Sequence, residues 1–266
     1  MGELRAYAAL GAAQIRSAAS YRMSFVIELF GNVGATVFDV LTVLVLFRAT
    51  PAVGGFTLRE AVLIVGISSA GFALADMLVG NVDRLKTYVR AGTLDAVLVR
   101  PLAALPQLLL MDLPIRKALR VVFGFTVLGL AVAANDVDWT PARVLLILIT
   151  PLAACVFFGS IFVLSASLAF WWVDSGEIGS AFTYGGRDFT SYPISVYGGW
   201  FRNLFAYALG FGFVAYQPAL ALLGRDDPLG LPAWSGFLSP LVALGAATLA
   251  GVVWRFGIRH YRSTGS

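Results

Sequence analysis

The sequence predicts an all-α integral membrane protein with six transmembrane helices, and three observations support this prediction. First, 59% of the 266 residues are hydrophobic and the mean hydropathy is +0.82. Second, only 13% are charged, whereas soluble domains average about 25%. Third, the apolar residues gather in segments near the roughly 20 residues needed to cross a bilayer. A chain of this length accommodates a single membrane domain over residues 1–266.

The amino-terminal residues 1–22 predict an amphipathic helix that lies in the membrane interface. Leu4 and Ile15 fall on one side of this helix, whereas Arg5 and Arg16 fall on the other. Helices with this pattern rest in the headgroup region of a bilayer. The segment is too long and too polar for the charged start of a cleaved signal peptide.

The long apolar segments predict the spans and the connections between them. A basic stretch, residues 83–101, follows the second span, and prolines interrupt the apolar residues 102–113. Because proline breaks the helical hydrogen-bond ladder, we expect residues 102–113 to be a partly embedded approach to the third span. Residues 174–203, rich in Gly, Ser and Tyr, are expected to be a connection. The predicted spans are residues 25–47, 58–79, 118–134, 144–173, 204–223 and 237–256.

The basic residues assign the sides of the membrane. Six spans place both termini on one side, and that side carries fifteen of the nineteen Lys and Arg residues. By the positive-inside rule, both termini and the basic stretch are expected in the cytoplasm. Arg strongly outnumbers Lys, and Ala and Gly are abundant, as in GC-rich bacterial genomes. We therefore expect a multi-pass protein of a bacterial inner (plasma) membrane.

The basic stretch predicts a short cytoplasmic helix between the second and third spans. Leu94, Val97 and Leu98 share one helix face at the i, i+3, i+4 spacing. Gly92 precedes the helix, Thr93 is placed to cap its first turn, and a proline ends it. The pattern fits a docking surface, and it equally fits an interfacial helix with a solvated basic face.

The sequence lacks the motifs that several classes of enzyme need. A phosphate-binding loop needs a lysine directly after a glycine, and neither Lys86 nor Lys117 follows one. No serine-hydrolase or zinc-protease motif is present. Single Cys155 and single His260 exclude an internal disulfide and disfavour a metal site. We therefore expect no enzyme activity and no cofactor in this chain, and the modest net charge of +4 does not indicate a nucleic-acid partner.

Two carboxylates fall inside predicted spans, Asp39 in the first and Asp76 in the second. Charged groups within the membrane mark proton relays or ion contacts, or they pair with a neighbouring helix, and both alternatives stay open here. The small residues Gly66 and Ala70 also lie on one face of the second span. They allow close helix approach, within the chain or at a dimer seam.

Three parts of the chain carry recognisable motifs, among them AGTLDAVLVRPL in the basic stretch and WRFGIRHYRSTGS at the end. The first resembles the cytoplasmic motif of bacterial ABC type-two permeases, and the second is similar to the usual terminus of that family. Family members often have a proline where this chain has Gly210, which puts any inherited kink of the fifth span in doubt. The strongest match, Thr190–Arg225, carries Tyr192, Pro193, Tyr216, Pro218 and Leu223-Gly224-Arg225.

The resemblance implies a permease that dimerises with itself or with a sister permease and recruits two separate ATPase subunits, which bind ATP and magnesium. Family members export drugs and other amphipathic small molecules, so multidrug efflux is the expected class of function. The residues expected to couple to the ATPase are Arg90, Gly92, Thr93, Leu94, Asp95, Val97, Leu98, Arg100 and Pro101. The candidates for the translocation path are Asp39, Asp76, Tyr192, Pro193, Gly210, Tyr216 and Pro218.

Two other hypotheses come from different functional classes. A proton-coupled secondary carrier would use Asp39 and Asp76 as its proton-binding groups. A membrane scaffold without transport activity would need neither these carboxylates nor a docking helix.

Overall fold

The computed structural model describes residues 34, 37, 41–50, 52–111 and 117–262, and the regular elements of this part are all helices. The predicted interfacial helix 1–22 and most of the first span lie outside the described residues, although residues 41–49 are helical. Helix α7 (Ala118–Ala134) is apolar and has 17 residues. Within the described residues, three helices are long and apolar enough to cross a membrane: Leu58–Leu78, Pro141–Phe170 and Ala233–His260.

Local sequence signals define the starts of the two central helices. Helix α3 (Leu58–Leu78) begins with a capping box, in which the Thr57 backbone N–H donates to the Glu60 carboxylate at 2.7 Å. Helix α8 (Pro141–Ser167) has a proline at its first position and Thr140 as its cap. A 3-10 turn continues α8 to Phe170. These helices confirm the predicted second and fourth spans.

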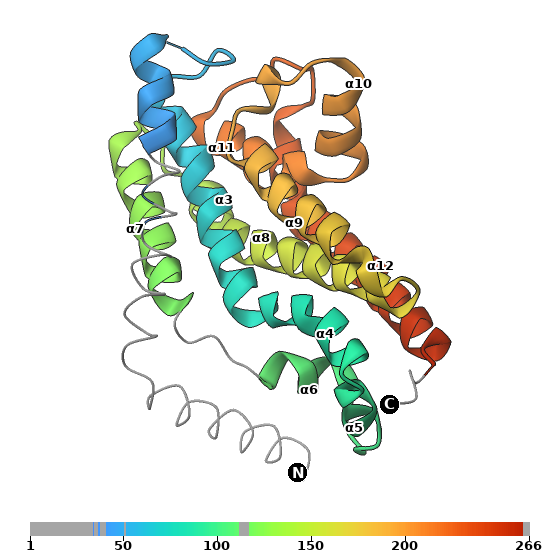
Figure 1. Ribbon diagram of the computed structural model, residues 1–266. Helices are drawn as coiled ribbons and strands as arrows, with labels where there is room; N and C mark the ends of the chain where they lie inside the picture. Colours follow the sequence, from blue (N-terminus) through green and yellow to red (C-terminus); the bar gives the residue numbers. More distant parts are fainter. Residues whose placement is uncertain (1–33, 35–36, 38–40, 51, 112–116, 263–266) are drawn as a thin grey trace.

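Small residues bring α3 into close contact with α7 (Figure 1). A Cβ atom added at Gly66 of α3 would lie 2.9 Å from the Leu128 Cα of α7, and one added at Gly124 would lie 3.0 Å from the Ala70 Cα. Neither site has room for a side chain. Gly66 and Ala70 therefore serve packing within the chain, which was one of the two alternatives for these residues.

Short helices turn aside below α3 and form a compact unit, the α4–α6 unit (Figure 1). The buried Gln107 side chain donates to the backbone oxygens of Val97 and Leu102 and joins its members. The predicted approach segment 102–113 is therefore part of this packed unit as far as it is described, because α6 closes over α5. The unit comprises η1 (Gly80–Arg84), α4 (Leu85–Arg90), α5 (Thr93–Leu98) and α6 (Ala104–Leu110).

The connection predicted for residues 174–203 instead contains a 15-residue helix, α9 (Gly176–Thr190). Its polar side chains are satisfied inside the bundle: Thr183 donates to Ser165 of α8, and Thr190 hydrogen-bonds Ser68 of α3. The sequence did not indicate this helix, because these buried polar partners, which lie far away in the chain, make up for its low hydropathy. Helix α9 leads from the lower end of the bundle, where α3 and α8 end, towards its upper end (Figure 1).

The predicted fifth span, residues 204–223, is not one straight helix. It consists of a helical part, Gly199–Ala208, and a second part, Phe211–Leu223, bent by 64° from the first. The break falls at Gly210, whose φ of +85° only glycine adopts readily. The chain therefore bends here through the left-handed conformation of a glycine.

Both ends of this bent pair lie at the upper end of the bundle. On its entry side, the Ser195 hydroxyl donates to the Gly54 carbonyl at 2.8 Å. On its exit side, Arg225 donates to the Gly55 carbonyl at 2.9 Å, and Arg143 at the start of α8 donates to Ala221. The pair has the geometry of a re-entrant segment, whereas α12 (Ser239–His260) runs the length of the bundle, as predicted for the last span.

Cysteine labelling tests this arrangement of the chain. In a Cys155→Ala background, we expect Gly198→Cys and Asp226→Cys to react with a membrane-impermeant maleimide from the same side of sealed vesicles. Thr87→Cys in α4 should react only from the opposite side, because all three positions are exposed and residue 87 lies at the lower end. Labelling of residue 198 together with residue 87 would restore the predicted topology and overturn this one.

Candidate functional site

The predicted coupling helix is present as α5, and a glycine sets its direction. Gly92 occupies the capping position with a φ of +66°, which turns the chain sharply after α4. Thr93 is the first helical residue, and its hydroxyl donates to the Tyr88 carbonyl at 3.2 Å. The expectation that Thr93 caps α5 is therefore wrong, because its side chain bonds backwards to the preceding helix.

The face of α5 expected to dock a partner is turned into the protein. Leu94 and Val97 are 0% and 2% exposed, because they pack into the core beside α4 and α6. Leu98 is 37% exposed and Val99, which follows the helix, is 83% exposed. Together with exposed Ala96 they form an apolar surface, the α5 tip (Ala96, Leu98 and Val99). The spacing rule found an amphipathic helix correctly but assigned its apolar face to the wrong neighbour.

Charged and polar residues surround the α5 tip. Arg90, at the end of α4, and Arg100, just before Pro101, are both exposed. Asp95 lies on another side of α5. Burial of the Tyr261 hydroxyl and, second, the Asp95 carboxylate raise the pKa of Tyr261. This contact ties α5 to the residue that ends α12. The coupling candidates therefore divide into an exposed apolar tip next to Arg100 and an inner side that anchors it.

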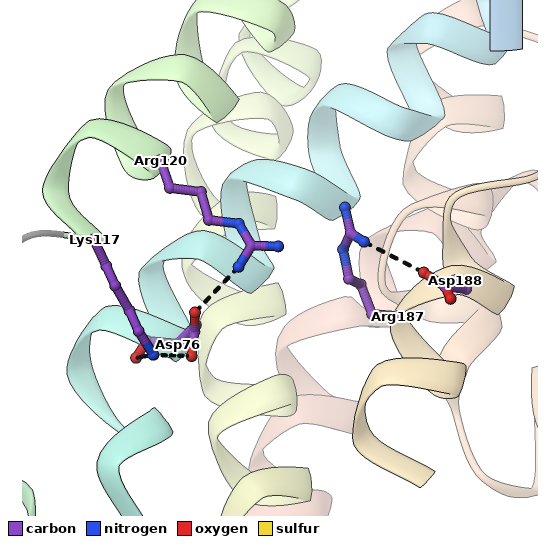
Figure 2. A network of polar contacts seen from close by, with 5 residues as sticks. All are labelled: Asp76, Lys117, Arg120, Arg187 and Asp188. Carbon is purple, nitrogen blue, oxygen red and sulfur yellow. Dashed lines mark hydrogen bonds and ion pairs between the residues drawn. The ribbon is translucent and has the colours of Figure 1, made fainter. Parts of the chain in front are cut away.

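Asp76 stands at the centre of a buried ionic network near the lower end of α3 (Figure 2). Its carboxylate is 3% exposed and accepts from Lys117 Nζ at 2.5 Å and from Arg120 at 3.2 Å. Both cations come from the start of α7. This geometry is the pairing with a neighbouring helix that competed with a proton relay, and Asp39, the other relay candidate, lies outside the described residues.

A second arginine approaches the same part of α3 from the opposite side (Figure 2). The guanidinium groups of Arg120 and Arg187 lie 5.4 and 5.5 Å from the centre of the Phe72 ring. Arg187 belongs to α9 and also pairs with its neighbour Asp188 at 3.3 Å. Cations at an aromatic face are stabilised by the ring's quadrupole. The network therefore connects α3 with α7 on one side and with α9 on the other.

The other path candidates do not gather at one site. Tyr216 is 1% exposed, packs on Phe56, and its hydroxyl donates to Asp227 at 3.3 Å. Pro218 is buried beside it in α11 (Tyr216–Leu223). These two residues stabilise the upper end of the bundle. Tyr192 packs against α3 near buried Pro193, and Gly210 forms the break described above. Among the path candidates that the structure describes, only Asp76 lies near the lower end.

Replacing Asp76 tests the ionic network. Asp76→Asn leaves two partly buried cations without their anion, so we expect a loss of about 3 kcal/mol in unfolding free energy, at the lower end of the range for a broken buried pair. Asp138→Asn is the control, because Asp138 is 98% exposed and its ion pair with Arg143, at 3.6 Å, lies at the surface. Thermal unfolding in detergent measures both variants. Equal, small effects would show that the Asp76 pairs contribute little.

The raised pKa of Asp83, at the same end of the bundle, predicts that folding stability depends on pH. Burial and the Asp76 carboxylate raise its pKa from 3.8 to about 6, against the opposing effect of Lys117 and Lys86. The folded state thus binds this proton more tightly than the unfolded chain, so stability falls as pH rises from 3.8 to about 6. Asp83→Asn should remove this slope and be the more stable form at pH 7. If the melting temperatures of the wild type and of Asp83→Asn change with pH in the same way, this prediction is wrong.

The comparisons with known proteins agree with this architecture. The family model described as ABC-2 family transporter protein matches residues 33–265, which is nearly the whole chain. No curated protein and no solved structure matches this sequence. The match includes the α4–α6 unit, the ionic network and the bent pair. A multi-pass membrane protein with this match is a permease component of a transporter, and the chain belongs to the ABC-2 transporter family.

Proposed function

We propose that this chain is the transmembrane subunit of an ATP-driven exporter and that the α5 tip contacts a separate ATPase subunit. The observation that carries the proposal is the α4–α6 unit, which stands beyond the end of α3 and presents exposed Leu98 and Val99. An exposed apolar tip next to Arg100 suits an apolar groove with an acidic rim. ATP and magnesium would bind in that partner, because this sequence has no phosphate-binding loop.

The proposal includes six membrane crossings with both termini in the cytoplasm of a bacterial cell. The crossings are the first span, α3, α7, α8, α9 and α12, with α9 in the place that sequence reasoning gave to residues 204–223. Basic residues support the lower end as cytoplasmic, because it carries Lys86, Arg90 and Arg100. Arg202, expected on the same side, belongs to the bent pair at the upper end.

We further propose that two permeases, identical or sister chains, enclose the substrate path and that α9 borders it. The outward face of α9 combines exposed Ile178, Tyr184, Gly185 and Asp188. A helix that crosses the bilayer with such a mixed face is better accommodated against a second chain or an aqueous path than against lipid. The mixture of apolar, aromatic and polar groups suits amphipathic small molecules as cargo.

Replacing Val99 tests the docking of the ATPase. Val99→Asp places a charge at the centre of the α5 tip, so we expect at least an approximately tenfold weaker association with the ATPase subunit. Thr87→Asp is the matched control, because Thr87 is exposed on α4 but lies outside the tip. Co-purification from native membranes and ATP-dependent transport by the same preparations are the measurements.

The outcomes separate folding from docking. Both variants should reach the membrane at wild-type levels, since both positions are exposed, whereas Leu94→Asp should not accumulate because Leu94 is fully buried. If no ATPase co-purifies with the wild-type chain and transport survives ATP depletion, the proposed function fails. If Val99→Asp keeps its ATPase, the docking surface lies elsewhere.

A further inference from the structure

Two basic residues of α4 face two acidic residues at the start of α9. Arg90 forms an ion pair with Asp174, and Lys86 Nζ lies 3.9 Å from a Glu177 carboxylate oxygen. Arg90 and Lys86 are four residues apart, which is one helical turn, and the two acids are three residues apart. Each pair of like charges thus shares one face of its own segment, so the two faces match.

The backbone at the start of α9 is adapted to this contact. Lys86 lies so close to Gly176 that a Cβ atom there would overlap its amine and the end of its stem. Asp174 and Glu177 also lie at the N-terminal end of α9, where negative charge is stabilised by the helix dipole. Charge, spacing and close packing therefore all join α4 to the same end of α9.

The opposite end of α9 contacts the bent pair. A Cβ atom at Gly186 would lie 2.5 Å from the Phe211 ring, so the backbone of α9 rests directly on that side chain. Phe189 stacks on Tyr197 with ring centres 4.4 Å apart and also contacts Phe205. Between these ends α9 is one uninterrupted helix. It therefore connects the α4–α6 unit with the segment that bends at Gly210.

The ion pairs at the lower end are exposed, which decides what they can do. The side chains of Arg90, Asp174 and Glu177 are 59%, 70% and 96% exposed. Exposed pairs add little to folding stability, because water and salt screen them and long side chains lose freedom when they pair. Such pairs can break and reform cheaply, which suits a contact between parts that move relative to one another.

We propose that the ion pairs Arg90–Asp174 and Lys86–Glu177 form an ionic latch that transmits movement of the α4–α6 unit to α9 and, through α9, to the bent pair. This inference rests on the proposed function, since the movement comes from the ATPase at the α5 tip. The latch makes α9 the element that links both ends of the permease. Neither basic residue belongs to the tip itself, so docking and transmission use different side chains.

Charge exchange in the native complex tests the latch. A reporter cysteine, Gly185→Cys in a Cys155→Ala background, lies on α9 with open space around it. In the complex with its co-purified ATPase, a non-hydrolysable ATP analogue should change the rate at which a water-soluble maleimide labels this cysteine. Arg90→Asp should reduce that change about two- to fivefold, the range of an exposed pair, and the exchange Arg90→Asp/Asp174→Arg should restore it.

The controls distinguish the latch from docking and from folding. Arg259→Asp alters charge at the exposed lower end of α12 and should leave the nucleotide response unchanged. All variants should retain wild-type thermal stability and ATPase co-purification. If Arg90→Asp keeps the full response, or if the exchange fails to restore it, the latch is wrong while the proposed function stands. If no ATPase co-purifies with the variant that carries only the reporter cysteine, and its transport survives ATP depletion, the proposed function itself fails.

Discussion

The structure depends on how closely α3 can approach its neighbours. In a bilayer, burial of apolar surface gives little drive for helices to associate, so close packing and polar contacts must hold them together. Gly66 and Gly124 leave backbone facing backbone at the contact between α3 and α7. That approach places Lys117 and Arg120 beside Asp76, and the other face of α3 then meets α8. Without the small residues, the charges would not meet.

Because α3 and α7 pack closely, the ionic network fixes the depth and the rotation of α3. A carboxylate in the membrane interior needs cationic or hydrogen-bonding partners, and α7 supplies two cations from its first turns. Arg187 brings α9 to the same ring of Phe72 on the other side. Helix α9, which runs between the two ends of the bundle, is therefore held against α3 in one arrangement.

The bent pair and α9 are consecutive segments, and the course of one depends on the course of the other. The bent pair begins and ends at the upper end of the bundle, whereas α9, although short and polar, runs between the two ends (Figure 1). Its hydroxyl groups bond to α3 and α8, which satisfies them away from water. A left-handed glycine then lets the chain reverse within the next segment. Hydropathy alone favours the more apolar bent pair over α9 as a span.

The sequence by itself determined the membrane class, the all-helical fold, the second, fourth and sixth long helices, and the presence of a short helix after Gly92. Each of these follows from composition or from signals within one turn of the chain, such as a cap or an apolar run. Only the tertiary structure decided that Leu94 and Val97 face inwards, that Asp76 is paired, that residues 176–190 form a helix through the bundle, and that Gly210 breaks the next. These depend on partners far away in the chain, and a helical pattern shows which residues share a face without showing what that face meets.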